Sequence, residues 1–167
     1  MDAKSQQGRS YGLVPPEIAV SMSGLELLRG MIAGQFPGPP IMQQIGFELV
    51  EVEHGRAVFG GTPAFQHYNP LGTVHGGYAA TLLDSCMGCS VHTTLPKGMG
   101  YTTLEFKVSL VRAITSDTGP VRAEGKVITS GRRVATAEGR LTDAGGRLLA
   151  HATTTCLVFE VAAREPT

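Results

Sequence analysis

The stretch that decides the fold runs Asn69-Pro70-Leu71-Gly72-Thr73-Val74-His75-Gly76-Gly77-Tyr78-Ala79-Ala80-Thr81-Leu82-Leu83-Asp84. Its first half has the composition of a turn-prone loop, and its second half predicts a helix that continues to about His92. Apolar residues recur at the spacing of one buried helix face, namely at Ala79, Leu82, Leu83, Cys86 and Met87. We expect the rest of the chain to be organised around this loop and helix.

The first turn of this helix is a candidate binding site for an oxygen atom that carries negative charge. Backbone N–H groups there have no partner within the helix, and the positive end of the helix dipole lies at the same place. Gly76 and Gly77 lack a Cβ, so a ligand could approach their amides closely. Asp84 is the one acidic residue of the predicted helix. We therefore interpret the loop and helix as the active site.

Length and composition favour one globular domain. The chain has 167 residues, enough for a sizeable core. Its formal net charge is zero and no basic stripe stands out, which argues against nucleic-acid binding. No apolar run approaches the roughly 20 residues of a membrane span, and residues 1–10 lack the layout of a signal peptide. We expect a cytoplasmic protein with no nucleic-acid or membrane partner.

The three cysteines cannot all pair with one another. Cys86 and Cys89 form a C-x-x-C motif, but it lies on the predicted helix and no second pair of metal ligands accompanies it. We interpret them as reduced helix residues rather than as a redox or zinc site, and we predict no metal.

The chain before the loop divides at about residue 40. Residues 1–40 are interpreted as a polar tail to residue 14 and a helical extension, in which Ser23 is a plausible cap with Glu26 three residues later. The prolines from Pro37 to Pro40 predict a rigid connector. From residue 41 the apolar period changes to two, and a hairpin is expected from residues 46–53 and 56–62.

The chain after the helix has the pattern of strands, at 103–110, 121–129, 134–142 and 148–159, followed by a tail at 161–167. In the first of them Leu104, Phe106, Val108 and Leu110 are expected on one face, with Thr103 opposite. Residues 41–160 therefore predict an α+β domain, an antiparallel sheet with the helix against one face.

With this element order, the run His75-Gly76-Gly77 followed by Leu82-Leu83-Asp84 resembles the hotdog-fold acyl-CoA thioesterases, in particular the phenylacetate-degradation-protein type. Further matching residues are Asn69, Gly72, residues 101–106, Gly131-Arg132-Arg133 and residues 152–156. The resemblance covers about residues 41–160. It implies a hotdog fold, in which the antiparallel sheet wraps around one long central helix.

The resemblance also implies a homodimer or a dimer of dimers that hydrolyses acyl-CoA thioesters. It implies no metal and no cofactor, since coenzyme A is part of the substrate. In the family a backbone N–H of the His-Gly-Gly segment polarises the thioester carbonyl, which assigns that role to Gly76 and Gly77. The helix carboxylate acts as nucleophile or general base, which assigns that role to Asp84.

The spacing of these groups adds a prediction about assembly. Asp84 follows His75 by nine positions, about 13–14 Å along a helix axis and roughly half a turn around it. Reacting atoms must approach to about 3–3.5 Å, so the amides and carboxylate of one chain cannot meet at one carbonyl carbon. We expect a site shared by two subunits. Small residues near Asp84, namely Gly77, Thr81 and Gly88, would let a partner helix approach.

Other residues receive supporting roles. Asn69 and His75 are expected to fix the loop and to hydrogen-bond near the carbonyl or the carboxylate. Thr102 and Thr103 could place the lytic water or line the acyl channel, although threonine is also simply a good strand former. Arg132 and Arg133, at a turn between strands, could meet the CoA phosphates or form a solvated turn.

Two other functions stay open at this point. One is a non-catalytic acyl-CoA-binding hotdog domain, which would be expected to carry a DNA-binding module. The other is a hotdog hydratase or dehydratase, which would need a histidine with an acidic partner placed for proton abstraction. The helix aspartate with His-Gly-Gly upstream fits hydrolysis better.

Overall fold

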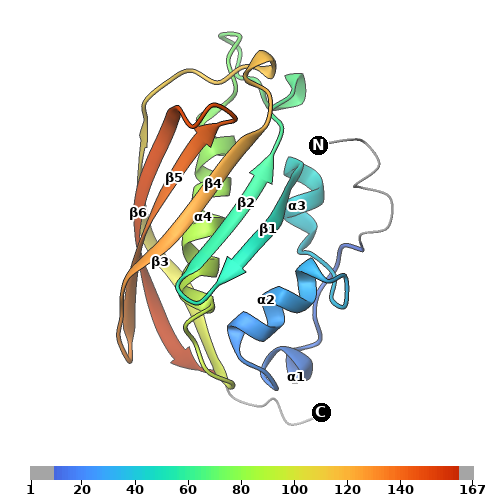
Figure 1. Ribbon diagram of the computed structural model, residues 1–167, viewed down its shortest axis with the longest axis vertical. Coiled ribbons are helices and arrows are strands. Elements are labelled where there is room, and N and C mark those ends of the chain that lie inside the picture. Colours follow the sequence, from blue (N-terminus) through green and yellow to red (C-terminus); the bar gives the residue numbers. More distant parts are fainter. Residues whose placement is uncertain (1–9, 162–167) are drawn as a thin grey trace.

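The computed structural model describes residues 10–161, so the ends of both predicted tails, residues 1–9 and 162–167, lie outside the described part. Six antiparallel strands form one sheet that curves around the long helix α4 (Figure 1). The strand order is β1-β2-β4-β5-β6-β3. The predicted α+β architecture, with one central helix, is confirmed.

Helix α4 and five of the six strands begin and end close to their predicted positions, whereas β3 begins earlier than predicted and α3 was not predicted. The helices are α1 (Pro16–Ala19), α2 (Gly24–Ile32), α3 (Pro40–Ile45) and α4 (Gly76–His92). The strands are β1 (Phe47–Glu53), β2 (Arg56–Gly61), β3 (Met99–Leu110), β4 (Val121–Ser130), β5 (Val134–Asp143) and β6 (Leu148–Glu160). Two single 3₁₀ turns, η2 (Phe65–His67) and η3 (Ser116–Thr118), lie in the connections.

Helix α4 lies close to the sheet because the strands present small residues to it. A Cβ on Gly125 of β4 would overlap the backbone carbonyl of Cys86, and one on Gly139 of β5 would lie 2.9 Å from Met87 Cγ. Fully buried alanines surround these two glycines, namely Ala57, Ala123, Ala135, Ala137 and Ala150. The buried face of α4 thus meets small residues at the middle of the sheet, and larger side chains such as Phe59 and Leu141 complete the core around this contact.

Strand β3 differs from its prediction because it contains a bulge. Thr103 pairs with Cys156 and Glu105 with Thr155, so Leu104 is an extra residue with no counterpart on β6. A bulge shifts the period-two alternation by one residue. Thr103 therefore faces α4 together with Val108 and Leu110, and the prediction that placed Thr103 opposite them is wrong. Leu104 is 57% exposed.

The segment before the sheet covers the outer edge of β1. Helix α2 lies beside β1 (Figure 1), and its predicted cap is confirmed by reciprocal hydrogen bonds between Ser23 and Glu26. The prediction that the tail extends to residue 14 is wrong, because Tyr11 forms a bridge with Gly38 and packs against the core.

Residues 41–45 belong to helix α3 rather than to a stretch of period two, which corrects the expectation for this region. The helix starts with Pro40 at a position that tolerates proline, and it ends at Gly46, whose φ of +72° favours glycine. At six residues it is too short to show a helical period in the sequence.

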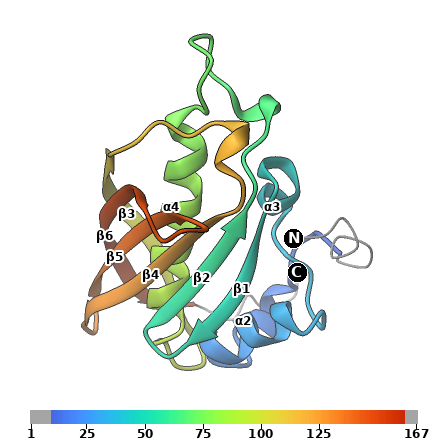
Figure 2. The same cartoon turned by 45° about the horizontal axis from the view of Figure 1, so that its top comes forward.

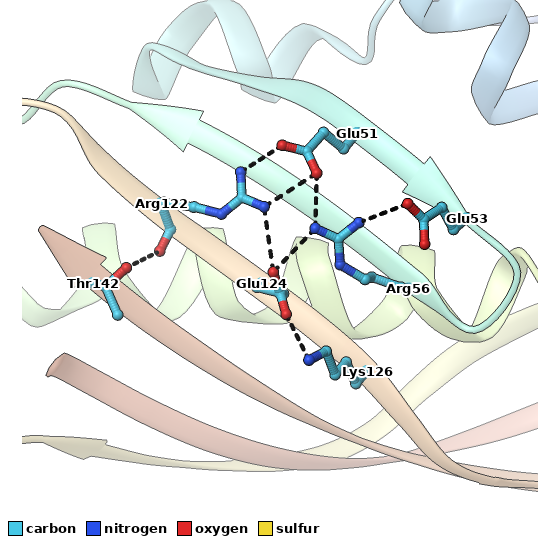
Figure 3. Close-up of polar contacts among 7 residues, drawn as sticks. All are labelled: Glu51, Glu53, Arg56, Arg122, Glu124, Lys126 and Thr142. Atoms are coloured by element: carbon cyan, nitrogen blue, oxygen red, sulfur yellow. Dashed lines mark hydrogen bonds and ion pairs between the residues drawn. The ribbon is translucent and has the colours of Figure 1, made fainter. Parts of the chain in front are cut away.

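The sheet face turned away from α4 carries a network of ion pairs (Figure 3). Arg56 and Arg122 both contact Glu51 and Glu124, at distances of 2.7–3.3 Å, and Lys126 lies 2.8 Å from Glu124. These residues tie β1, β2 and β4 together across the sheet.

Candidate active site

The loop before α4 projects beyond the end of the sheet (Figure 2), and Asn69 holds it in shape. The side-chain oxygen of Asn69 accepts the backbone N–H of Leu71 at 2.8 Å, and its amide nitrogen donates to the Thr73 hydroxyl at 2.9 Å. The Asn69 backbone N–H also donates to the Thr73 carbonyl at 2.8 Å. Gly72, with a φ of +85°, completes the turn. These bonds match the loop-fixing role expected of Asn69.

His75 caps the start of α4. Its Nδ1 accepts the backbone N–H of Gly77 at 2.9 Å, so the neutral ring carries its proton on Nε2. The backbone N–H of His75 donates to the His67 carbonyl at 2.7 Å, which fixes the start of the helix. Within residues 10–161, the N–H of Gly76 has no hydrogen-bond acceptor. Of the two glycine amides, only that of Gly76 is therefore free for a ligand.

The two glycines lie close to the chain's own side chains. A Cβ on Gly76 would lie 2.8 Å from Cδ1 of Leu110, and one on Gly77 would lie 2.8 Å from Nδ1 of His75. The first contact lets the end of β3 pack against the helix start, and the second lets the histidine cap form. The missing Cβ atoms therefore also serve contacts within the chain, and the expectation that they let a ligand approach the amides stays a prediction.

Asp84 lies in the middle of α4 and is held by β3. The hydroxyl of Thr103 donates to Asp84 Oδ1 at 3.0 Å, and the carboxylate is partly exposed. Thr102, the preceding residue on the strand, is exposed. The structure thus brings Thr103, but not Thr102, to the carboxylate.

Asp84 and the free amide do not meet within one chain. Gly76 starts α4 and Asp84 lies eight residues further along it, about 12 Å along the helix axis. The expectation that Gly88 leaves room for a partner helix is wrong, because a Cβ there would lie 2.9 Å from the Tyr101 ring of the same chain.

Two clefts flank the start of α4, and His75 lines both. The first cleft, of about 240 Å³, lies between the loop and the end of β3; it includes Asn69, His75, Gly76, Leu110 and Arg112. The second cleft, of about 360 Å³, lies on the other side; it is lined by Ile45, Gln66, His67, Tyr68, His75, Gly77, Tyr78 and Thr81.

The arginines divide between the two ends of β3. Arg132 and Arg133 lie in the turn between β4 and β5, where the Arg133 carbonyl accepts the N–H of Val158, a residue paired with Tyr101. Leu110, in the first cleft, lies nine residues further along the strand, up to about 30 Å of extended chain. Within one chain these arginines therefore lie far from the free amide of Gly76.

Arg112 is a cation of the first cleft that the sequence did not point to. It lines the first cleft, and its guanidinium donates to the Leu148 carbonyl at 2.5 Å. The available signal was its position directly after the predicted strand 103–110, at the same end as the loop.

The C-x-x-C cysteines lie inside the fold. Cys86 is buried, and burial raises the pKa of Cys89 to about 12, so that thiol is protonated at neutral pH. Among residues 10–161, no group of three or more histidine, cysteine or acidic side chains could hold a metal ion. No helix in this range is long and apolar enough to cross a membrane.

Comparison with known proteins decides the family. Residues 71–150, which contain most of the loop, all of α4 and β3 to β5, match the family model described as the thioesterase superfamily. The chain belongs to the thioesterase superfamily. The family resemblance seen in the sequence is therefore confirmed, although the search of curated proteins returned no match.

Solved structures confirm the hotdog fold of this thioesterase superfamily member. A phenylacetic acid degradation-related protein from Ralstonia eutropha JMP134 is 28% identical, with a TM-score of 0.71 over 78% of this chain and 98% of the other. A variant of the phenylacetic acid degradation protein PaaI from Thermus thermophilus is 27% identical, with a TM-score of 0.64 over 71% and 97% of the two chains. A Streptococcus mutans UA159 protein solved with acetyl CoA shares the fold at 24% identity, with a TM-score of 0.63 over 69% and 90%.

Proposed function

We propose that this superfamily member is an acyl-CoA thioesterase that hydrolyses its substrate to a free acid and coenzyme A. The observation that carries the proposal is the unpaired N–H of Gly76, which lies at the start of α4 and lines the first cleft. The bound acetyl CoA of the Streptococcus mutans protein supports this class of substrate on the same fold.

The free amide suits the charge that develops in thioester hydrolysis. As the carbonyl carbon is attacked, negative charge builds on the carbonyl oxygen. A preorganised N–H donor aimed at that oxygen typically lowers the barrier by about 3–4 kcal/mol. The positive end of the helix dipole also stabilises the negative charge on the oxygen. The Nε2–H of His75, which lines the same cleft, is available as a second donor. Gly77 supports the site through its bond to His75.

Asp84 supplies the second half of the chemistry. Its carboxylate either attacks the thioester carbon directly or takes a proton from the attacking water. The hydroxyl of Thr103 orients one carboxylate oxygen, which leaves the other for the reaction.

Gly76 and Asp84 of one chain lie too far apart to act on the same carbonyl group, so we propose that each site is shared between two subunits. Strand β3 is the last strand of the sheet, and Leu104, Phe106 and Leu110 on it are 39–58% exposed. A long apolar edge strand is a template for pairing with another chain. A second copy of β3, paired antiparallel about a two-fold axis, brings each Asp84 toward the partner's helix start.

The same pairing gives the arginines a role. Because the two copies of β3 run in opposite directions, the β4–β5 turn of the partner moves toward the first cleft. Arg132 and Arg133 can then meet the CoA phosphates from the second subunit, while Arg112 faces the cleft from its own subunit. Arginine suits this task because its planar guanidinium binds phosphate oxygens in pairs.

Release of free thiol from a panel of acyl-CoAs tests the proposed function. The wild type should release thiol from at least one acyl-CoA, and Asp84→Asn should lower kcat by about 100-fold or more, on the order expected for loss of a nucleophile or base. Asp117→Asn, on the exposed turn η3, is the matched control and should leave kcat unchanged. Binding of acyl-CoA without thiol release would instead favour a non-catalytic binding domain.

A further inference from the structure

The second cleft continues the site on the other side of the helix start. His75 lines both clefts, Gly76 lines the first and Gly77 lines the second. A thioester whose carbonyl oxygen binds the Gly76 amide therefore has one cleft on each side of its reacting carbon. The first cleft contains the polar groups Asn69 and Arg112, which suit the CoA arm.

The second cleft is lined by rings, and the described residues around it include no carboxylate, ammonium or guanidinium group. Tyr68, Tyr78 and His67 present aromatic rings, and Ile45 adds an aliphatic side chain. The hydroxyl of Thr81 already donates to the Gly77 carbonyl at 2.8 Å. Burial lowers the pKa of His67, so its ring is neutral at pH 7. A cleft of about 360 Å³ falls within the usual range for small-molecule sites, about 300–1,000 Å³.

The walls of this cleft are fixed before any ligand binds. The hydroxyl of Tyr68 accepts the backbone N–H of Ser116 at 2.9 Å and shares a 3.0 Å hydrogen bond with its side chain. The His67 ring stacks on Tyr78 with centroids 4.5 Å apart, and its Nδ1 accepts the N–H of Ala64 at 3.0 Å. Rigid walls allow a cleft to discriminate by size and charge.

Ile45 comes from outside the strands and α4. It is the last residue of α3, and the left-handed turn at Gly46 directs the chain from there into β1. The short helix before the sheet therefore closes one side of the cleft, and the side chain at position 45 limits the space within it.

We propose that the second cleft holds the acyl group of the substrate, and that Ile45 and Tyr68 determine its specificity. The acyl group is uncharged and larger than acetyl, because the cleft has room for several carbon atoms and its described lining offers no cation to pair with a carboxylate. This inference rests on the proposed thioesterase activity and names the substrate class and the residues that select it.

Filling the cleft by substitution tests the inference. In Ile45→Trp, kcat/KM for hexanoyl-CoA and benzoyl-CoA should fall about tenfold or more, because a pocket contact of this size discriminates by about 10- to 200-fold. The value for acetyl-CoA should change less than about threefold, which also shows that the variant is folded. Ile41→Trp is the matched control: Ile41 lies on the same helix, is 49% exposed and does not line the cleft, so it should change none of these values.

The substrate preference of the wild-type protein tests whether the acyl group is uncharged. Hexanoyl-CoA and benzoyl-CoA should both exceed succinyl-CoA in kcat/KM by about tenfold or more, because the carboxylate of a succinyl group would lose hydration in the cleft without gaining a cationic partner. An equal or better value for succinyl-CoA would overturn the assignment of an uncharged acyl group. A parallel fall of all substrates in Ile45→Trp, or no fall at all, would overturn the assignment of the cleft.

Measurements of binding affinity test the acyl cleft independently of hydrolysis. In an Asp84→Asn background, the ratio of the Kd of CoA to the Kd of benzoyl-CoA measures what the acyl group adds to affinity. That ratio should fall about tenfold on Ile45→Trp and stay constant on Ile41→Trp. If the wild type releases no thiol from any acyl-CoA, the proposed function fails, whereas an unchanged ratio refutes the acyl cleft itself.

Discussion

The hydroxyl of Thr103 donates a 3.0 Å hydrogen bond to Oδ1 of Asp84. This contact depends on the β-bulge at Leu104, which turns Thr103 toward α4. The hydroxyl of Thr154 supports the bulge by donating to the Glu105 carbonyl at 2.8 Å. The strand thus holds the one carboxylate of the helix in a single orientation.

Thr103→Val removes this hydrogen bond with almost no change in shape. We expect kcat to fall about tenfold with little change in KM, since the carboxylate is oriented less well but the binding surface is preserved. Thr103→Ser keeps the hydroxyl and should retain most of the activity. Steady-state kinetics on both variants provide the measurement, and equal activities in the two would show that the hydroxyl has no positioning role.

Gly76→Ala should destabilise the protein through Leu110. The added Cβ would lie 2.8 Å from Leu110 Cδ1, and because this side chain is flexible and 58% exposed, we expect a cost of about 1 kcal/mol, at the low end for overpacking. Leu110→Ala in the same chain removes the clash, so the double variant should lose less stability than the two single losses added together. Urea unfolding of the four proteins measures this coupling, and strict additivity would contradict the contact.

Gly125→Ala should destabilise the fold more than Gly139→Ala. The first Cβ would overlap the rigid backbone of Cys86, whereas the second meets only the flexible side chains of Met87 and Leu83. We expect a loss of about 3 kcal/mol or more for the first and about 1–2 kcal/mol for the second. Thermal unfolding of both variants gives the comparison, and the reverse order would mean that α4 does not pack on β4 as described.

The ion-pair network predicts sensitivity to acid (Figure 3). Hydrogen bonds from Lys126 and Arg56 lower the pKa of Glu124 to about 2. A carboxylate with a lowered pKa in the folded state stabilises the fold above its unfolded pKa of about 4.5, and this contribution disappears as the pH falls from there to about 2.

Glu124→Gln should therefore cost about 1–2 kcal/mol at pH 7, allowing for partial exposure of the side chain. Near pH 2 the variant and the wild type should be equally stable. Glu53→Gln, on the same face but 70% exposed, should cost less than about 0.5 kcal/mol at either pH. Denaturant unfolding at both pH values decides the matter, and a cost for Glu124→Gln that does not depend on pH would contradict the role of its charge.

Periodicity over long elements predicted the fold well. The helix from Gly76 to His92 was visible because its apolar face repeats over several turns, and the strands because they alternate. The sequence did not reveal α3 or the bulge at Leu104. Six residues are too few for a helical period, and a bulge depends on how the strand pairs with β6, which no local pattern reports.

The sequence named candidate site residues, but it did not show how those residues contact one another. The motif pointed to Asn69, His75, Gly76 and Asp84 as a group around the loop and helix. It did not show that Gly77 donates to His75, nor that Leu110 fills the space beside Gly76, because both contacts require coordinates. The same holds for Arg112, which reaches the first cleft only through the path of the chain after β3.

The shared site is the central claim, and the structure suggests a way to remove the Gly76 amide alone. Proline lacks an N–H and is well tolerated at the first position of a helix. The ψ of +137° at His75 is suitable for a residue before proline. Combining Gly76→Pro with Leu110→Ala makes room for the ring, and Gly76→Ala with Leu110→Ala is the control that keeps the N–H.

The most direct test mixes two inactive proteins, Asp84→Asn and Gly76→Pro with Leu110→Ala, under conditions of subunit exchange. If each site takes its amide from one subunit and its carboxylate from the other, half of the dimers are mixed and each of these has one intact site. Thiol release should then recover to about a quarter of the wild-type rate. A mixture no more active than the average of its two parents would contradict a shared site.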